Sequence, residues 1–252
     1  MRVLVTRPAL EAGRWVERLR GRGIDAMALP LLAIGPAPDN AALQAARSQL
    51  ASFSAVMFVS ANAVHGFCTP ALDWPAGTRA WGPGPATGDA LREHAVPAGA
   101  IDAPAADAAQ FDSESLWRVV DGQLARGDRL LLVRGADAQG RSQGREWLAA
   151  QLAAAGVQVE VVCAYSRALP VWTDPQRELV VRSAGDRALW LFSSSEAAVN
   201  LGQLAPGLQW QGARALATHP RIAQTVRALG FSAVHECRPG FEDVVASIES
   251  IR

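Results

Sequence analysis

The sequence predicts an α/β protein made of two parallel-sheet domains, one of them inserted into the other. Short apolar runs alternate with amphipathic segments along most of the chain, which is typical of parallel strands covered by helices. A strand–helix–strand pattern occurs twice, at residues 2–29 and 129–163, and a strand followed by a polar turn occurs at 56–64 and again at 189–199. The second pattern precedes the first in one copy and follows it in the other. One copy must therefore close through both chain ends.

These repeats predict a discontinuous domain of residues 1–35 and 172–252, with an inserted domain of residues 36–171. Proline, which interrupts regular strand pairing, is found at both expected crossings between the domains: Pro30, Pro36 and Pro38 at the first, Pro170 and Pro175 at the second. Two crossings create a cleft between the domains, where we expect a ligand to bind.

Each domain is expected to hold five strands with helices between them, a flavodoxin-like arrangement whose strand order is not visible in the sequence. In the discontinuous domain we expect strands at 2–6, 24–32, 187–192, 213–217 and 232–236, and helices through 12–19 and at 195–203, 220–229 and 241–250. In the inserted domain we expect strands near 55–60, 79–82, 99–102, 129–134 and 157–164, and helices near 62–67, 86–94, 113–125 and 141–155.

Local patterns justify individual elements. Apolar residues recur through 12–19 at the i, i+3, i+4, i+7 spacing of one helix face. Residues 130–133 are apolar throughout, as expected for a strand buried on both faces. The helix at 220–229 begins with Pro220 and is followed by Gly230, the positions where proline and glycine are favoured.

Composition excludes several classes of function. The formal net charge is zero, from 24 basic and 24 acidic residues, so no overall field favours nucleic acid or an anionic membrane. Every one of those basic residues is arginine, which excludes lysine Schiff-base chemistry and the lysine of a phosphate-binding loop. No apolar run approaches the roughly 20 residues of a membrane span, and the chain enters a strand at once, without room for a signal peptide. We therefore expect a cytoplasmic protein.

The spacing of histidines and cysteines indicates no metal site, and we expect neither metal nor cofactor. Cys68, Cys163 and Cys237 are odd in number and widely separated, so we expect reduced thiols. The glycine-rich segment 82–88 resembles a dinucleotide-binding loop. It contains two prolines, however, and proline lacks the N–H group that a pyrophosphate needs. A bound nucleotide is not expected.

Candidate ligand-binding residues lie at the expected strand-to-helix turns, because helix N-termini offer free N–H groups there. Ser60 and Asn62 occupy one such turn, and Ser193 and Ser194 occupy the equivalent turn of the other domain. Ser193 and Glu196 have the spacing of a capping box. These polar side chains either contact a ligand or only cap their own helices.

Further candidates are arginines and hydroxyl groups. Arg7 and Arg134 occupy matching positions at the ends of matching strands, so each holds a ligand carboxylate, forms a structural ion pair or is a solvated residue at the rim. Arg221 lies in the first turn of an expected helix, where the helix dipole disfavours a cation by roughly 0.3–1 kcal/mol. Thr87, at the start of another helix, can donate to a ligand. Tyr165, the only tyrosine, ends a strand before the second crossing and is either a proton donor or a core residue.

The order and spacing of these segments resemble the uroporphyrinogen-III synthase family over essentially the whole chain. The similar segments are 3–8, 57–64, 84–91, 130–135, 164–167, 191–194 and 217–223. The resemblance implies that hydroxymethylbilane, a linear tetrapyrrole with an acetate and a propionate group on each ring, binds between the two domains. It implies cyclisation of this substrate with inversion of ring D to give uroporphyrinogen III, in the biosynthesis of haem and sirohaem, without metal or cofactor.

The same resemblance implies roles for individual residues. Tyr165 matches the family tyrosine proposed to assist departure of the substrate hydroxyl. The residues that match positions near the bound tetrapyrrole are Ser60, Asn62, Thr87, Ser193 and Ser194. Many family members have a Gly-x-Thr turn where this chain has His219-Pro220-Arg221. Arg221 is therefore expected to replace a hydroxyl as a carboxylate partner.

Two other classes of protein fit parts of the sequence. A non-catalytic two-domain binding protein for a small anionic ligand shares the layout, although its periplasmic kind needs an export signal. A regulatory protein with receiver-like domains needs clustered acidic residues at a strand end, where this chain has Ser, Thr, Arg and Gly. The flat charge and the absence of an obvious apolar patch predict a monomer that binds neither nucleic acid nor membrane. Hydroxymethylbilane is the binding partner that the resemblance implies. A transient contact with the upstream deaminase is compatible with the sequence.

Overall fold

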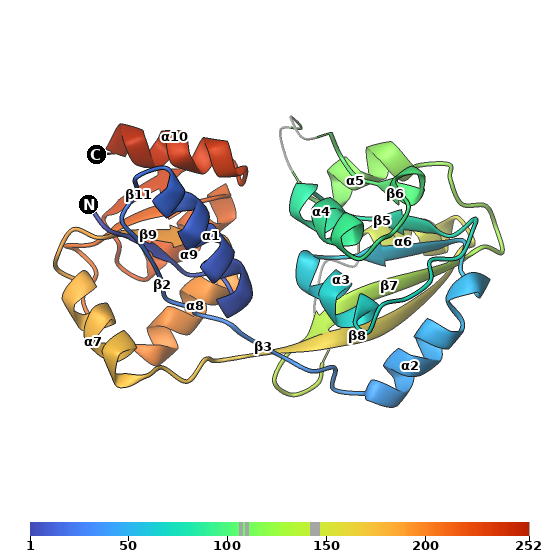
Figure 1. Ribbon diagram of the computed structural model, residues 1–252, viewed down its shortest axis with the longest axis horizontal. Coiled ribbons are helices and arrows are strands. Elements are labelled where there is room, and N and C mark those ends of the chain that lie inside the picture. Colours follow the sequence, from blue (N-terminus) through green and yellow to red (C-terminus); the bar gives the residue numbers. More distant parts are fainter. Residues whose placement is uncertain (106–107, 109–110, 142–146, 252) are drawn as a thin grey trace. The chain divides into compact units, whose positions relative to one another are not determined.

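The computed structural model describes residues 1–105, 108, 111–141 and 147–251 (Figure 1). The chain divides into two compact units: Met1–Ala33 with Ala168–Arg252, called unit 1, and Ile34–Arg167, called unit 2. The predicted fold class is confirmed, because each unit contains a sheet built on parallel strand pairs, with helices packed on it. None of the helices in the described part of the chain is long and apolar enough to cross a membrane.

Unit 1 contains a sheet with the strand order β11-β10-β9-β1-β2, in which every adjacent pair is parallel. Its strands are β1 (Val3–Val5), β2 (Ala26–Ala28), β9 (Leu189–Phe192), β10 (Arg214–Ala217) and β11 (Ala233–Glu236). Its helices are α1 (Ala9–Gly21), α7 (Asp174–Ser183), α8 (Ser195–Leu204), α9 (Pro220–Ala228) and α10 (Phe241–Ile251). Counted along the chain, the strands have the 2-1-3-4-5 order of flavodoxin-like folds.

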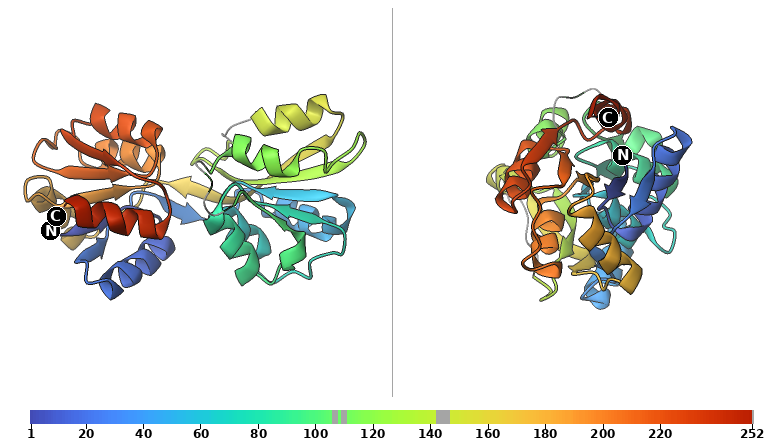
Figure 2. Two further views of the ribbon diagram at one scale, coloured as in Figure 1. Left: turned by 90° about the horizontal axis from the view of Figure 1, so that it is seen from above. Right: turned by 90° about the vertical axis from the view of Figure 1, so that its left-hand side faces the viewer.

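The strands of unit 1 are buried on both faces. Leu4 packs with apolar residues of α7, α8 and α9 on one face. Its neighbours Val3 and Val5 pack with α1 and α10 on the other face. Figures 1 and 2 show this division, with the blue α1 and the red α10 on the same side of the sheet. Because successive side chains of a strand point to opposite faces, an apolar run of this kind requires cover on both sides.

Unit 2 contains a sheet with the order β3-β8-β7-β4-β5-β6. Its strands are β3 (Ala33–Gly35), β4 (Ala55–Phe58), β5 (Arg79–Trp81), β6 (Ile101–Asp102), β7 (Arg129–Ala136) and β8 (Gln158–Ala168). Its α-helices are α2 (Asn40–Ser48), α3 (Ala61–Cys68), α4 (Pro85–Glu93), α5 (Ser113–Val120) and α6 (Trp147–Ala154), with short 3₁₀ turns at Leu50–Ser52 and Ala98–Ala100. Without the edge strand β3, this is the arrangement of unit 1, with β7 and β8 in the places of β1 and β2.

Two apolar clusters cover the sheet of unit 2. On one face, Val56, Phe58 and other strand residues pack with α2, α3 and α4. On the opposite face, Met57, Leu130 and Leu132 pack with α5 and α6. The face beneath α5 and α6 also carries the pocket described below.

The strand expected at 24–32 is shorter than predicted, and the residues that follow it form a strand of the other sheet. β2 ends at Ala28, and the chain then forms β3 at Ala33–Gly35 beside β8. Pro30 lacks the N–H group needed to continue the ladder of β2. In the described part of the chain, the sheet of unit 2 therefore has six strands rather than the expected five.

Two helices that the sequence reasoning did not predict, α2 and α7, begin beside prolines. Asp39 caps α2 by accepting a hydrogen bond from the backbone N–H of Ala42 at 2.9 Å. Pro175 lies in the first turn of α7, where the missing N–H has no intrahelical partner and proline is tolerated. These prolines start helices instead of only breaking strands.

Two predicted helices differ in length from the observed ones. α5 ends at Val120 rather than near residue 125, because the chain turns at Gly122, which has a φ of 78°. The helix expected at 141–155 is observed as α6 at Trp147–Ala154, and residues 142–146 lie outside the described part of the chain.

Candidate active site

The centre of the candidate site in unit 2 is a contact between Tyr165 and Ser60. Ser60 follows β4 and caps α3, where its Oγ accepts a hydrogen bond from the N–H of Ala63 at 3.3 Å. The same Oγ lies 3.2 Å from the phenol oxygen of Tyr165, which comes from β8 and is buried. The structure thus brings together two predicted site residues, at the edge of the sheet where parallel-sheet proteins bind ligands.

Gly135 makes room for the Tyr165 ring. β7 and β8 pair with a register shift: Arg134 lies opposite Cys163, and Gly135 lies opposite Tyr165. A Cβ atom at position 135 would lie 2.6 Å from Cε2 of Tyr165, which is much closer than van der Waals contact. Only glycine therefore allows the ring to lie against β7 and reach Ser60.

The sequence predicted that Arg134 lies at the end of its strand, and this is wrong. β7 continues to Ala136, and Arg134 is 5% exposed inside it. Among the described residues, its Nε atom has no hydrogen-bond partner. The sequence pattern could not show this burial, because the strand is lengthened by its pairing with β8.

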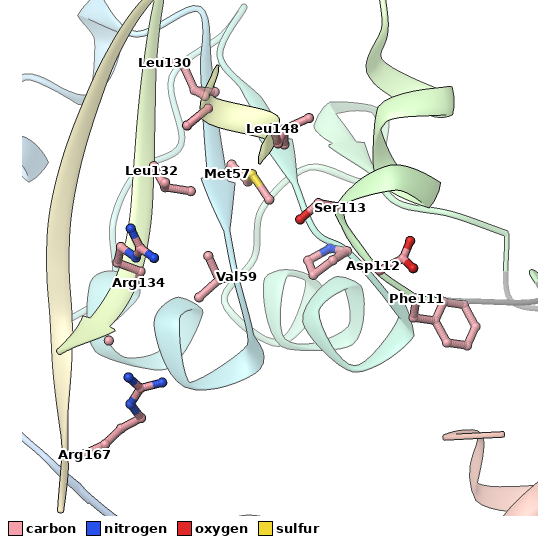
Figure 3. A pocket seen from close by; sticks show the side chains of 13 residues that line it. Met57, Val59, Phe111, Asp112, Ser113, Leu130, Leu132, Arg134, Leu148 and Arg167 are labelled. Atoms are coloured by element: carbon pink, nitrogen blue, oxygen red, sulfur yellow. The ribbon is translucent and has the colours of Figure 1, made fainter. Parts of the chain in front are cut away.

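A pocket of about 250 Å³ lies next to Arg134 (Figure 3). Its apolar lining includes Met57, Leu130, Leu132 and Leu148, and its polar lining includes Arg134, Arg167, Asp112 and Ser113. Gly135 also lines it, so one glycine contacts both the pocket and the Tyr165 ring. Arg167, Asp112 and Ser113 were not predicted as site residues. Arg167 could have been proposed from its position, because it lies two residues after Tyr165 near the end of the same strand.

Thr87 and Asn62 lie in the first turns of neighbouring helices of unit 2. Thr87 is the third residue of α4 and is buried. Its Cγ2 atom is close to Gly82, where a Cβ would approach it to 2.9 Å. Asn62 is the second residue of α3 and is partly exposed. Their assignment as substrate-binding residues remains a prediction.

Arg7 in unit 1 forms local contacts that match the structural alternative considered for it. Its Nη1 donates to Glu11 at 3.2 Å, and its guanidinium carbon lies 4.2 Å from the centre of the Trp15 ring. Burial lowers the pKa of Arg7, and the ion pair with Glu11 opposes that shift. Nε of Arg7 is buried without a hydrogen-bond partner in the described part of the chain.

The other predicted residues of unit 1 lie at two helix N-termini. Ser194 caps α8, because its side chain accepts a hydrogen bond from the N–H of Ala197 at 3.4 Å. The capping-box spacing had instead suggested Ser193 as the cap. Arg221 has an exposed side chain, and its backbone N–H donates to Nδ1 of His219, the cap of α9, at 3.1 Å. Substrate binding by Ser193, Ser194 and Arg221 remains a prediction.

No group of three or more histidine, cysteine, aspartate or glutamate residues is arranged to hold a metal ion in the described ranges. The three cysteines are free thiols. Burial raises the pKa of Cys68 to about 12 and that of Cys237 to about 11. Neither is a thiolate near neutral pH, so neither provides an activated nucleophile.

The fold and the candidate site define a two-unit α/β protein with hydroxyl side chains at strand-to-helix turns of both units. Arginines accompany them, at such turns in unit 1 and within the strands β7 and β8 in unit 2. A family model described as uroporphyrinogen-III synthase HemD matches residues 13–246. The chain therefore belongs to the uroporphyrinogen-III synthase family, whose members are lyases of porphyrin biosynthesis. The predicted family and its predicted activity are confirmed at this level.

Solved structures with the same fold agree with this assignment. A crystal structure of uroporphyrinogen-III synthetase from Helicobacter pylori is 14% identical, covers 100% of both chains and has a TM-score of 0.60. A mutant uroporphyrinogen III synthase from the extremely thermophilic bacterium Thermus thermophilus is 16% identical, covers 99% of this chain and 98% of the other, and has a TM-score of 0.56. At such low identities, these similarities support the fold and not the roles of single residues.

Proposed function

We propose that this chain cyclises hydroxymethylbilane to uroporphyrinogen III with inversion of ring D, and that Tyr165 is the proton donor for the first step. The observation that carries this role is the 3.2 Å contact between the Tyr165 phenol and Ser60. Ser60 Oγ already accepts a hydrogen bond from Ala63, so its own proton can be donated to Tyr165. In that arrangement Ser60 donates to the phenol oxygen, and the phenol O–H can be directed at the substrate.

The first step breaks the bond between the terminal carbon of the substrate and its hydroxyl group. Tyr165 supplies the proton, so that the hydroxyl leaves as water and an azafulvene cation remains. The hydrogen bond from Ser60 stabilises the phenolate that develops, and the proton lost when the ring closes restores the phenol. A positioned acid of this kind typically contributes a factor of about 10²–10⁴ to the rate.

The second task of the protein is to hold the flexible substrate in the conformation that closes with ring D inverted. We propose that Arg134 and Arg221 hold acetate and propionate groups, because guanidinium groups match the geometry of carboxylates. The polar residues Ser60, Asn62, Thr87, Ser193 and Ser194 are proposed to contribute through hydroxyl, amide and backbone N–H groups. Arg7 belongs to the same proposal as a guanidinium in the turn between β1 and α1.

The test of this function is the isomer composition of the product. Hydroxymethylbilane is generated in situ, the protein is added, and the oxidised uroporphyrins are separated by chromatography, with a sample without protein as the control. A predominance of isomer III is the expected result. Formation of isomer I at the rate of the control would contradict the proposal, and a non-catalytic binding protein would become the better description.

We also propose that the chain works as a monomer in the cytoplasm. The zero net charge and the three free thiols support this view. Size-exclusion chromatography with light scattering tests the monomer, and a mixture with the upstream deaminase tests the transient contact. A dimer mass would overturn the first part.

A further inference from the structure

Arg134 is a buried cation that is only partly satisfied by the protein. The residue is 5% exposed, and its Nε atom has no hydrogen-bond partner among the described residues. At Nε the guanidinium has lost water without gaining an equivalent contact, which costs free energy. Because Arg134 also lines the pocket, an anion bound there would offset part of this cost.

The pocket beside Arg134 has two chemically different ends. Figure 3 shows the guanidinium groups of Arg134 and Arg167 at one end and the side chains of Leu130 and Leu148 at the other. Met57 and Leu132 lie between these ends. A ligand that matches both ends has an apolar body and at least one carboxylate.

The size of the pocket suits one ring of the substrate. Its volume is about 250 Å³, which is slightly below the roughly 300–1,000 Å³ of pockets that hold a drug-sized molecule. A complete tetrapyrrole does not fit in this space. A single five-membered ring with two short side chains does.

The charges that face the pocket favour an anion. Two guanidinium groups and one carboxylate line it. The carboxylate, Asp112, caps α5 by accepting the N–H of Ser115 at 2.8 Å, and it lies across the pocket from the two arginines in Figure 3. The lining therefore carries one more positive charge than negative charge, and the positive charges lie together.

We infer that this pocket binds one terminal pyrrole ring of the linear substrate, with the ring against Leu132 and Leu148 and its carboxylates on Arg134 and Arg167. The choice of a pyrrole as the ligand rests on the proposed function. The pocket makes Arg134 a residue that selects rings bearing carboxylates and anchors one end of the substrate. Such an anchor limits the conformations from which the ring can close.

Replacement of Arg134 by methionine separates this role from a structural one. Methionine is apolar and of comparable length, so the Arg134→Met variant removes a buried charge without leaving a large cavity. If the protein does not need the guanidinium for its fold, the melting temperature stays unchanged or rises, as it does when buried charges are replaced by apolar residues. Binding of the pyrrole weakens at least tenfold, because a charge-assisted hydrogen bond is lost.

The experiment is isothermal titration calorimetry with 3-carboxymethyl-4-(2-carboxyethyl)pyrrole as the probe and its dimethyl ester as the uncharged comparison. The variants are Arg134→Met, Arg167→Gln and Ala149→Leu, the last of which fills the pocket and leaves both arginines in place. Arg129→Gln is the matched control, because Arg129 begins the same strand but pairs with Glu160 at 2.6 Å. Melting temperatures of all variants are recorded with the same preparations.

The inference predicts that the diacid binds the unmodified protein with one site, that the ester binds at least tenfold more weakly, and that Arg129→Gln leaves the affinity unchanged. Arg134→Met, Arg167→Gln and Ala149→Leu are each expected to weaken binding at least tenfold. If the diacid does not bind, or if it binds Arg134→Met and Ala149→Leu as tightly as the unmodified protein, the inference is overturned. Ala149→Leu keeps the test valid even if Arg134→Met does not fold.

The product assay distinguishes failure of this inference from failure of the proposed function. If isomer III is formed but the diacid does not require Arg134, the synthase function stands and the ring pocket is wrong. If the diacid requires Arg134 but only isomer I is formed, the pocket stands as a carboxylate site and the proposed function is wrong.

Discussion

At the residue scale, the candidate site depends on a few side chains that are held by close packing and hydrogen bonds. Tyr165 reaches Ser60 only because position 135 has no side chain, and Ser60 is held in turn by its hydrogen bond to the N–H of Ala63. These contacts fix the position of a phenol oxygen near the end of two strands. A small displacement of the ring would break the 3.2 Å contact.

The first prediction concerns Tyr165. The Tyr165→Phe variant removes the proposed proton donor and keeps the ring that packs against Gly135. We expect turnover to fall more than tenfold, because general acid catalysis is lost, while the circular dichroism spectrum stays the same. The measurement is the rate of isomer III formation. A turnover equal to that of the unmodified protein would remove Tyr165 from the mechanism.

The second prediction concerns the buried thiols. Burial raises the pKa of Cys68 to about 12 and that of Cys237 to about 11, from an ordinary value of 9.0. Both thiols are therefore protonated at pH 8 and should react slowly with Ellman's reagent, because the thiolate is the nucleophile. When the protein is unfolded in urea, all three cysteines are expected to react quickly with the reagent. Fast reaction of Cys68 in the folded protein would contradict the predicted burial.

The same shifts determine a pH dependence of stability. Each folded-state pKa is raised, so the stabilisation from these groups is complete below pH 9 and is lost as the pH rises towards 11 to 12. Urea unfolding at pH 8 and pH 10.5 measures this loss. The Cys68→Ala variant should lose less stability over that interval than the unmodified protein.

At the element scale, a side chain of the helix α2 holds a neighbouring segment of unit 2 by hydrogen bonds. α2, which the sequence reasoning did not predict, is linked to the chain after α3 by Arg47. The buried Arg47 guanidinium donates to the carbonyl oxygens of Thr69 at 3.1 Å and Pro70 at 2.6 Å. This single side chain joins two elements on one face of the sheet of unit 2.

The third prediction tests that link. The Arg47→Met variant leaves two carbonyl groups without their donor, and hydrogen bonds to charged groups contribute about 1.5–3 kcal/mol. We expect the free energy of unfolding to fall by about 2 kcal/mol, measured by urea denaturation. Gln44→Met, on the exposed side of the same helix, is the control and should change stability by less than about 0.5 kcal/mol. Equal effects of both changes would show that the link contributes nothing.

At the scale of the whole molecule, the two units have the same strand arrangement but a different starting point in the chain. In unit 2 the strands follow the chain order β4, β5, β6, β7, β8. Unit 1 would have the same order if the chain ran from Ala168 to its C-terminus and then continued at Met1. Both termini lie together in unit 1, since Arg214 contacts both Met1 and the carbonyl of Ile251, as Figure 2 also shows.

The fourth prediction follows from this relation. A circular permutant of unit 1, with residues 168–252 joined by a short glycine–serine linker to residues 1–33, should fold and unfold cooperatively. Residues 168–252 alone should not, because they lack β1, which lies between β9 and β2 in the sheet. Circular dichroism and thermal melting measure both. Cooperative folding of the fragment without β1 would contradict the central role of this strand.

Much of this architecture could be predicted because the relevant signals are local. The apolar run of β1 and the proline and glycine that bound α9 are visible in short segments. The prediction failed where one local signal has two meanings, since proline both ends strands and starts helices, as at α7. Among the site residues, Ser60 was predicted from its turn, whereas the pocket residue Arg167 was not predicted.

The sequence by itself determined the α/β class, the repeated plan and the family of this protein, because periodicity, turn residues and motif order are properties of neighbouring residues. Only the tertiary structure decided that β3 joins the sheet of unit 2, that Arg134 is buried, and that Tyr165 meets Ser60 across 105 residues of sequence. These features depend on strand register and packing between distant segments. No local pattern encodes such contacts, and the chain forms them only when its sheets assemble.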